Sequence, residues 1–448
     1  MKYFGTDGFR GRVNENLTVD HAIKIGKFLG FYFSNTKGKV RCVIGKDTRK
    51  SGYMYEYGLV AGLTSTGVDV SLLHVTTTPS VSYITRTENF DFGIMITASH
   101  NPFYDNGIKI IDSNGYKMSD NVLELVEDYI DGKIDIELAK NENIGRASDY
   151  IQGRNKYISY LAGVSSQSFR GYKVGLDTAN GASFMIAKNV FDMLGAQTYI
   201  INNEPNGLNI NKDCGSTHIE GLQALVKEKN LDIAFAFDGD ADRCLAVDEN
   251  GNVIDGDMII YIYGSYLKEK GQLVKDTVVT TIMSNLGLTK ALEAKGIKNI
   301  QTPVGDKYVS AEIQKEKYSV GGEQSGHVII DKYATTGDGI LTAIKTMEVI
   351  IEKKCTLSSL VSDVTIFPQN LINVRLENME EVLASDELKE AQQAILDELK
   401  DTGRIVLRKS GTEPVVRVMV EAMTKEEAVK YSESLKDSLI EISEKVKA

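Results

Sequence analysis

The sequence predicts an α/β protein, with three similar α/β domains and a smaller C-terminal α+β domain. One pattern, a buried strand followed by a polar turn and the start of a helix, occurs at 39–52, 173–195 and 276–296. The last part of the chain departs from this pattern and has the order β-α-β-β-α. A chain of 448 residues is also too long for one hydrophobic core. Together these observations predict several domains, of which the last belongs to a different class.

The elements of the α/β part follow in order along the chain. We expect a strand, a turn and a helix start in KVRCVIGKDTRKSG (39–52), and a further strand in VSLLHVTTTPS (70–80). Residues 173–195 and 276–296 repeat the first pattern. This alternation is typical of mixed sheets that are covered by helices.

The C-terminal part predicts a strand at 370–376, a helix at 385–400, and the strands GRIVLR and PVVRVMVE around KSGTE. From Lys425 onward, apolar residues three or four positions apart predict one face of an amphipathic helix: Ala428, Tyr431, Leu435, Leu439, Ile442 and Val446. Domain boundaries are expected in the polar stretch 139–149, at the hairpin 248–252 and near Phe367. The expected domains are 1–150, 151–250, 251–366 and 367–448.

Composition and charge exclude several classes of protein. A hydrophobic content of 42% and a charged content of 25% are ordinary for a soluble globular protein. The net charge of −11 argues against nucleic acid and anionic membranes as partners, although local arginines can still bind a phosphorylated substrate. The start MKYFGTDGFRG does not resemble a signal peptide, and no apolar run approaches the ~18 residues of a membrane span. The four cysteines have no metal-binding spacing, so we expect reduced thiols in a cytoplasmic protein.

Chemistry is first suggested by MITASHNPFYDNGIKI (95–110). An apolar run, FGIMIT, ends abruptly and is followed by Ser99 and His100, with Lys109 further along. A buried strand here presents a hydroxyl and an imidazole in a loop, which raises the question of what this serine does.

Three carboxylates, those of Asp238, Asp240 and Asp242, occupy alternate positions just after the apolar strand IAFAF. Carboxylates this close repel one another unless a cation lies among them, and oxygen ligands indicate Mg²⁺ or Ca²⁺. An EF-hand is excluded because Arg243 stands where its loop requires glycine, and because the flanking segments resemble strands. The alternative is a solvated acidic turn.

Two further polar clusters point to an anionic, hydroxyl-bearing ligand. Near the C-terminus, the backbone of a loop between two strands can form an anion site flanked by two arginines; its residues are Arg408, Ser410, Gly411, Thr412 and Arg417. In GGEQSGHVII, we expect Glu323, Ser325 and His327 to face one way in an extended conformation, where they would suit sugar hydroxyls. The alternatives are a tight turn for the first cluster and a polar edge strand for the second.

These segments carry a family resemblance. TASHNP, DGDADR, GGEQSGH and RKSGTEPVVR occur in this order over essentially the whole chain, which resembles the α-D-phosphohexomutase superfamily. Within it the chain is most similar to the bacterial phosphoglucosamine mutases, through KYFGTDGFRG, NPFYDNGIK, VGDKYV and Gln324. Many members have glycine in place of Ala241, a departure that leaves the three carboxylates intact.

The resemblance implies four domains around a central cleft, with Ser99 as a phosphoserine on the first. It implies that Asp238, Asp240 and Asp242, on the second domain, hold one Mg²⁺ together with an oxygen of Ser99. The third domain would carry the sugar loop, with Glu323 and Ser325, and the fourth would carry the phosphate loop.

The implied reaction interconverts glucosamine 6-phosphate and glucosamine 1-phosphate through glucosamine 1,6-bisphosphate, feeding the synthesis of UDP-N-acetylglucosamine and cell-wall precursors. The bisphosphate or another phosphoryl donor would prime Ser99. Lys109, His100 and Arg10 are the candidates for proton transfer and charge stabilisation. In addition, Arg243, Asp306 and Lys307 are candidates for contact with the substrate.

Two other activities remain open, a phosphomannomutase/phosphoglucomutase and a phosphoserine-dependent sugar phosphatase. The sequence also leaves open a homodimer, and phosphorylation of Ser99 by a kinase or by autophosphorylation.

Overall fold

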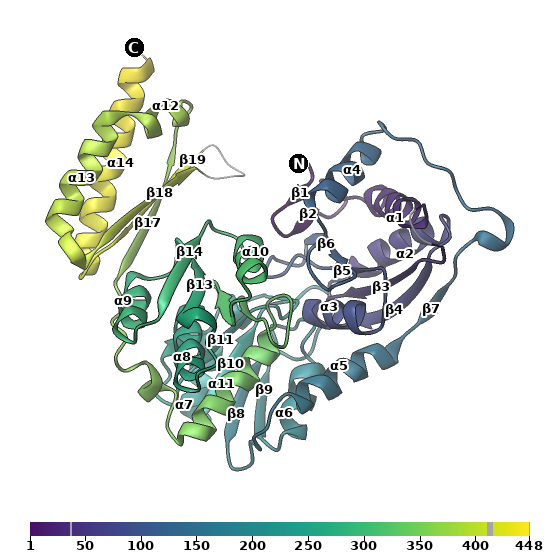
Figure 1. The fold of residues 1–448 in the computed structure, drawn as a ribbon, viewed down its shortest axis with the longest axis horizontal. Helices are drawn as coiled ribbons and strands as arrows, with labels where there is room; N and C mark the ends of the chain where they lie inside the picture. Colours follow the sequence, from purple (N-terminus) through teal and green to yellow (C-terminus); the bar gives the residue numbers. More distant parts are fainter. Residues whose placement is uncertain (36–37, 410–414, 448) are drawn as a thin grey trace. The chain divides into compact units, whose positions relative to one another are not determined.

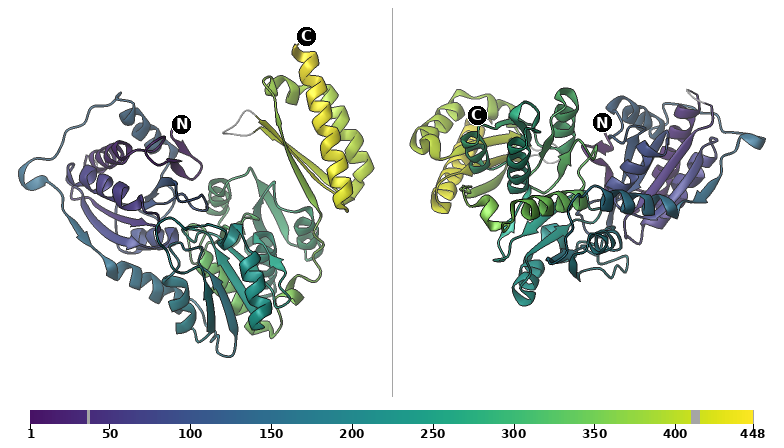
Figure 2. Two further views of the ribbon diagram at one scale, coloured as in Figure 1. Left: turned by 180° about the vertical axis from the view of Figure 1, so that it is seen from behind. Right: turned by 60° about the horizontal axis from the view of Figure 1, so that its bottom comes forward.

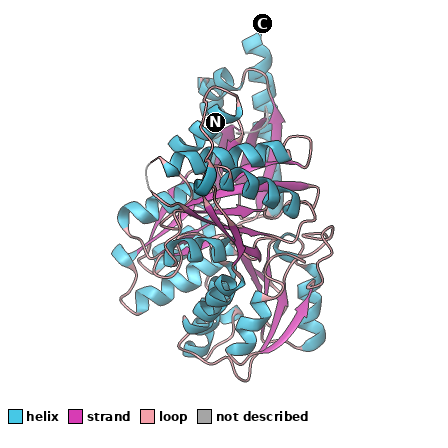
Figure 3. Cartoon of the chain, turned by 90° about the vertical axis from the view of Figure 1, so that its right-hand side faces the viewer, coloured by secondary structure: helices cyan, strands magenta, loops and turns pink. Residues whose placement is uncertain are grey.

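The computed structural model describes residues 1–35, 38–409 and 415–447. Helices and strands alternate along most of this length, and the strands form four sheets. Figure 3 distinguishes the helices from the strands by colour. The elements belong to two compact units: Met1–Thr281 with Ile300–Val361, and Ile282–Asn299 with Ser362–Ala448. In the part of the chain that is described, no helix has the length and apolar character needed to cross a membrane.

The first sheet has seven strands in the order β1-β2-β6-β5-β3-β4-β7. Its strands are β1 (Phe4–Gly5), β2 (Gly8–Arg12), β3 (Arg41–Lys46), β4 (Asp69–Val75), β5 (Phe92–Ile96), β6 (Asp105–Asp112) and β7 (Ala147–Asp149). The strands predicted within 39–52 and 70–80 are thereby confirmed as β3 and β4. The stretch 139–149, expected to be only a polar boundary, contributes β7 as a parallel edge strand beside β4.

Helices cover both faces of this sheet (Figure 1). On one face lie α1 (Val19–Ser34), α2 (Gly52–Thr64) and α4 (Asp120–Ile130), and on the other lie α3 (Thr78–Thr87) and α5 (Ile151–Gly163). Alternation along β3 explains this, because Cys42 and Ile44 join the core of the first face while Val43 joins that of the second.

The second sheet has the order β12-β11-β10-β8-β9. It consists of β8 (Lys173–Asp177), β9 (Gln197–Ile201), β10 (Ile233–Phe237), β11 (Cys244–Val247) and β12 (Val253–Ile254), with α6 (Ile186–Met193) and α7 (Glu220–Lys229) packed on it. Leu222 of α7 packs with Ala234 and Ala236, and Phe191 of α6 contacts Phe235, which points to the other face. The predicted hairpin at 248–252 joins β11 to β12, so this sheet extends to Ile254.

The third sheet has the order β14-β13-β15-β16. It consists of β13 (Thr277–Thr281), β14 (Lys298–Thr302), β15 (Val320–Gly322) and β16 (Val328–Ile330), accompanied by α8 (Gly256–Glu269), α10 (Asp306–Glu316) and α11 (Gly339–Lys353). The extended conformation expected for 323–327 is wrong, because this segment is a tight turn between β15 and β16. Glu323 N donates to His327 O at 3.1 Å, and Gly326, at φ 94°, donates to Glu323 O at 3.0 Å.

The second unit contains an antiparallel sheet with the order β17-β19-β18. Its elements are β17 (Gln369–Arg375), β18 (Arg404–Lys409), β19 (Val415–Glu421), α9 (Leu286–Ala294), α12 (Met379–Ala384), α13 (Asp386–Leu399) and α14 (Lys425–Lys447). Figure 2 shows α13 and α14 side by side on one face of the sheet. The predicted apolar face of α14 is buried from Ala428 to Ile442, whereas Val446, in the last turn, is 45% exposed.

Three mixed sheets covered by helices, followed by a small antiparallel sheet with helices, confirm the predicted fold class.

Candidate functional site

Ser99 and Asp238 are in contact although they lie 139 positions apart in the sequence. Ser99 lies in the loop after β5 and Asp238 follows β10, so each is delivered by the carboxyl end of a fully buried strand. Ser99 Oγ donates a hydrogen bond to Asp238 Oδ2 at 2.6 Å. Ser99 has a left-handed backbone with φ 52°, which is costly for any residue other than glycine and is held by its surroundings.

The three aspartates form a buried acidic cluster, with ligand oxygens that all lie within 4.8 Å of one another. Burial, and then repulsion from Asp242 and Asp240, raises the pKa of Asp238 well above its ordinary value. Asp240 Oδ1 and Asp242 Oδ1 are buried and accept no hydrogen bond. Buried carboxylate oxygens without donors suit a hard cation, so this cluster can hold a divalent metal ion.

Lys109, on β6, lies against the cluster. Its Nζ is 2.8 Å from Asp240 Oδ2, 3.0 Å from Asp242 Oδ2 and 3.0 Å from Asp7 Oδ2. Burial would lower the pKa of Lys109, but the three carboxylates outweigh it and hold that pKa well above the ordinary value. In this arrangement Lys109 is a fixed positive charge.

Arg10 and His100 complete the basic side of the site. Arg10, on β2, lies opposite Gly107 of β6 and pairs with Asp7. His100 Nδ1 is 3.4 Å from Ser99 Oγ. Burial, with repulsion from Arg243 and Arg10, lowers the pKa of His100 to about 4. Its imidazole is therefore neutral near pH 7.

The residues of the 323–327 turn separate in the structure. Glu323 Oε1 accepts a hydrogen bond from Gly305 N at 3.1 Å, and the Ser325 side chain is exposed. His327 is buried and lies beside the cluster. Its Nδ1 is 3.6 Å from Asp242 Oδ1, and its Nε2 accepts a hydrogen bond from Gly337 N at 3.0 Å. His327 thus lies against Asp242 of the acidic cluster and does not line up with Glu323 and Ser325.

Arg243 directly precedes β11, the strand that leaves the acidic turn. Its backbone N donates to Asp238 Oδ1 at 3.1 Å, and its buried Nε has no hydrogen-bond partner. This leaves a guanidinium donor available beside the cluster.

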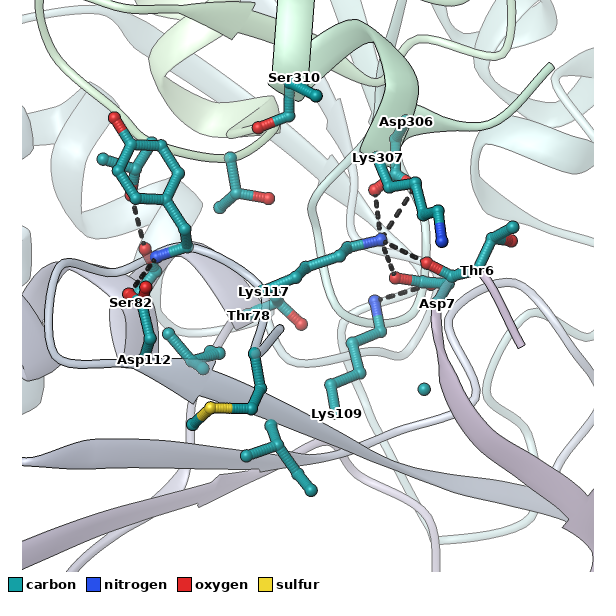
Figure 4. A pocket seen from close by; sticks show the side chains of 18 of the residues that line it. Thr6, Asp7, Thr78, Ser82, Lys109, Asp112, Lys117, Asp306, Lys307 and Ser310 are labelled. Atoms are coloured by element: carbon teal, nitrogen blue, oxygen red, sulfur yellow. Dashed lines mark hydrogen bonds and ion pairs between the residues drawn. The ribbon is translucent and has the colours of Figure 1, made fainter. Parts of the chain in front are cut away.

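Two charged residues at the site, Asp7 and Lys117, were missed by the sequence reasoning. Lys117 Nζ lies 2.7 Å from Asp7 Oδ1 and 2.6 Å from Asp306 Oδ2, so it joins the N-terminal segment to the start of α10 (Figure 4). Asp306 is therefore engaged by Lys117, and the neighbouring Lys307 pairs with Asp120 at 3.0 Å. The only sequence signal for Asp7 was its place three positions before Arg10 in FGTDGFRG.

A cavity of about 460 Å³ adjoins these groups. It is lined in part by Lys109, Lys117, Asp242 and His327. The acidic cluster is therefore reachable from a space large enough for a small molecule.

In the second unit, Arg408 and Arg417 are direct cross-strand partners on β18 and β19. Burial and the charge of Arg417 lower the pKa of Arg408. Ser410, Gly411 and Thr412 lie outside the described residues. Two guanidinium groups placed opposite each other favour an anion between or near them.

Four family models match the chain in succession. They are the phosphoglucomutase/phosphomannomutase alpha/beta/alpha domain I at residues 1–136, domain II at 154–251, domain III at 255–367, and the C-terminal domain at 371–438.

Individual relatives agree with these models. A phosphoglucosamine mutase of Lachnoclostridium phytofermentans is 58% identical over 435 residues, covering 97% of each chain. One of Anoxybacillus flavithermus is 46% identical over 435 residues, again covering 97% of each. Among solved structures, a phosphoglucomutase/phosphomannomutase family protein from Burkholderia thailandensis superposes with a TM-score of 0.83 at 22% identity, covering 98% of this chain and 97% of the other.

The matched segments include the serine loop, the acidic cluster and the paired arginines. The chain belongs to the phosphoglucomutase/phosphomannomutase family, and within it to the group of the phosphoglucosamine mutases.

Proposed function

We propose that this chain interconverts glucosamine 6-phosphate and glucosamine 1-phosphate through a phosphoserine at Ser99. The observation that carries the proposal is the hydrogen bond from Ser99 Oγ to Asp238 within a buried cluster of three aspartates. The relatives are named phosphoglucosamine mutases, and these names support an amino sugar phosphate as the substrate.

Magnesium is the proposed metal, held by Asp238, Asp240, Asp242 and an oxygen of phosphorylated Ser99. It would offset negative charge on the phosphoryl group during transfer. The two carboxylate oxygens without hydrogen-bond donors support this assignment.

In the first transfer, the bond from phosphorus to Ser99 Oγ breaks and a bond to the O1 hydroxyl oxygen of glucosamine 6-phosphate forms. In the second, the 6-phosphoryl group of the resulting glucosamine 1,6-bisphosphate returns to Ser99 Oγ, which leaves glucosamine 1-phosphate. Ser99 thus ends each cycle phosphorylated, and the reaction needs no net phosphoryl donor.

Each attacking hydroxyl must lose a proton. His100 is the proposed acceptor, because it lies beside Ser99 Oγ and its pKa of about 4 keeps it neutral. Lys109 and Arg10 are proposed to stabilise the transferring phosphoryl group as fixed positive charges. Lys109 is the alternative proton carrier. It would fill this role when a metal ion, and not Lys109, binds the carboxylates of Asp240 and Asp242.

Substrate recognition is divided among several groups. Glu323 and Ser325 are proposed to bind sugar hydroxyls, with Arg243 beside them. Lys307 is a further candidate contact, whereas Asp306 and His327 are proposed to act through Lys117 and Asp242. A phosphate of the substrate would be held by the anion site of the second unit, which comprises Arg408, Ser410, Gly411, Thr412 and Arg417.

The cellular setting proposed here is the cytoplasm, where the product would enter UDP-N-acetylglucosamine and cell-wall precursor synthesis. All four cysteines are free thiols in the described structure, which agrees with a reducing compartment. Glucosamine 1,6-bisphosphate is the proposed primer of Ser99.

The test is a coupled assay of glucosamine 1-phosphate formation, with and without Mg²⁺, on the wild type and on Ser99→Ala. Ser113→Ala, on an exposed turn, is the matched control. We expect Ser99→Ala to lose nearly all activity and the phosphorylated species seen by intact mass, while Ser113→Ala keeps both.

Parallel assays with glucose and mannose phosphates test the sugar preference, and release of inorganic phosphate tests a phosphatase. Full activity in Ser99→Ala would overturn the mechanism. A preference for another hexose, or net phosphate release, would overturn the assigned reaction.

A further inference from the structure

Arg49 is buried to 0% exposure and lies beneath the Ser99 loop. Its Nη2 donates to Ser99 O at 2.9 Å and to Asn101 O at 2.8 Å. Its Nη1 donates to Asp105 O at 3.0 Å and also to Pro102 O. Three backbone carbonyls of the loop, and that of Asp105 at the start of β6, thus converge on a single guanidinium group.

The remaining guanidinium donor connects Arg49 to the other side of Ser99. Arg49 Nε donates to Asp47 Oδ2 at 2.9 Å, and the same oxygen accepts from Thr97 Oγ1 at 2.7 Å. Thr97 Oγ1 in turn accepts from Ser99 N at 2.9 Å. Both backbone polar groups of Ser99 are therefore held, its carbonyl directly by Arg49 and its N–H through Thr97 and Asp47.

The loop needs such support because residues 97–104 belong to no strand or helix and because Ser99 adopts the left-handed backbone conformation. Only arginine offers five N–H donors in one rigid plane, and lysine offers three on a flexible stem. The negative charge of Asp47, itself 1% exposed, offsets the buried positive charge.

From the segment between β9 and α7, Asn211 Nδ2 also donates to Ser99 O, at 2.8 Å. A Cβ on Gly239 would lie 2.5 Å from that same oxygen, so the acidic turn packs directly on it. The position of Ser99 O therefore determines how the serine meets Asp238.

We infer that Arg49 is a positioning residue, which sets Ser99 Oγ at transfer distance from the three aspartates by holding the backbone of its loop. This inference rests on the proposed function. The Arg49 side chain is fully buried and its donors are bonded within the protein, so it acts on the rate of phosphoryl transfer and hardly on binding. A displacement of about 1 Å at a reacting atom can cost about a hundredfold in rate.

The first test is Arg49→Lys, which retains the charge but not the planar donors. We expect kcat to fall about a hundredfold while KM for glucosamine 6-phosphate stays within about threefold. Lys46→Gln is the matched control, since Lys46 is equally buried, lies on β3 and bonds to Glu56 away from the loop. It should lower the melting temperature without the selective loss of kcat.

Hydrogen exchange read by mass spectrometry tests the loop without any activity assay. Peptides covering 97–105 should exchange at least about tenfold faster in Arg49→Lys than in the wild type or in Lys46→Gln, whereas α1 should be unchanged. In a second variant, Arg49→Ala, millimolar guanidinium ion should restore part of kcat by occupying the vacated space, and methylammonium ion should not.

Wild-type kcat or wild-type exchange in Arg49→Lys would overturn the inference. So would an equal fall of kcat in Lys46→Gln. A failure of the proposed function can be told apart from a failure of this inference. In that case the wild-type enzyme has no mutase activity, but hydrogen exchange at 97–105 is still faster in Arg49→Lys than in the wild type.

Discussion

The carboxylates of Asp238, Asp240 and Asp242 lie close together, and single residues around them offset their repulsion. Lys109 contacts two of them, Ser99 donates to the third, and two oxygens still lack donors. Ala241, between Asp240 and Asp242, has φ 56°, a conformation that costs other residues roughly 1–2 kcal/mol relative to glycine. The turn is therefore held in this conformation by its neighbours.

Asp240→Asn removes one charge from the cluster, and we expect Mg²⁺ affinity to fall about ten- to a hundredfold. Without metal the variant should be as stable as the wild type or more so, because repulsion is reduced. The measurement is the rise of the melting temperature with added Mg²⁺, together with direct titration of the metal. Asp437→Asn removes the same charge from an exposed site on α14 and serves as the control. An unchanged response to Mg²⁺ in Asp240→Asn would show that the cluster is not the metal site.

At the scale of elements, strand register and helix capping determine where charges lie. The antiparallel register of β18 and β19 puts Arg408 directly across from Arg417, and two like charges in this position repel each other. This pairing is the described part of the proposed phosphate site.

Arg417→Ala should raise KM for glucosamine 6-phosphate about ten- to a hundredfold, since a charge-assisted contact contributes roughly 1.5–3 kcal/mol. It should also lower kcat and release more glucosamine 1,6-bisphosphate, because the intermediate must be bound again before the second transfer. KM, kcat and released bisphosphate are measured together, with Lys430→Ala on α14 as the control. If all three values matched the wild type, the phosphate would bind elsewhere.

Asp338 caps the N-terminus of α11, accepting from Leu341 N at 3.0 Å and from the Tyr157 hydroxyl at 2.7 Å. Burial raises its pKa to about 6. Because this pKa lies above the value of about 3.9 in an unfolded chain, the folded protein binds the proton more tightly. The resulting stabilisation is present below about pH 4 and is lost as pH rises through about 6.

Asp338→Asn should therefore gain stability relative to the wild type between pH 4 and pH 6.5, by roughly 3 kcal/mol in total. Above pH 6.5 the difference should stay constant. Thermal unfolding across this pH range measures it, with Asp437→Asn as the exposed control. A difference that does not change with pH would mean that Asp338 is ionised at every pH tested.

At the scale of the whole molecule, the second unit is assembled from two distant segments, 282–299 and 362–448. The fully buried Glu421 joins them, because it pairs with Arg404 and accepts from Leu286 N at 3.0 Å. Arg404 also donates to Ser284 O. One carboxylate thus ties the three-stranded sheet to the segment that contains α9.

Glu421→Gln leaves Arg404 without its partner, and breaking a buried pair of this kind costs roughly 3–5 kcal/mol. We expect faster proteolysis within 362–448 and a lower unfolding temperature for this unit. Mg²⁺ binding by the first unit should be unaffected. Glu433→Gln, which removes an exposed pair with Lys436, should change little. Equal effects of the two substitutions would show that Glu421 does not hold the unit together.

Local chemistry in the sequence by itself determined much of this protein. Strand–turn–helix patterns predicted β3 with α2 and β8 with α6, and the spacing of apolar residues predicted the buried face of α14. The acidic cluster was also predictable, because its three carboxylates are separated by single residues and their repulsion is a local property.

Only the tertiary structure decided which distant groups meet. The contact of Ser99 with Asp238, the pairing of Lys117 with Asp7 and Asp306, and the enclosure of Arg49 by carbonyls of the serine loop all depend on how separate strands and loops pack. The sequence also misled at 323–327, where polar residues in alternation suggested extended backbone but Gly326 permits a tight turn. Sequence periodicity describes the faces of one element, whereas a site such as this one is built where several elements end, and its geometry is determined by their packing.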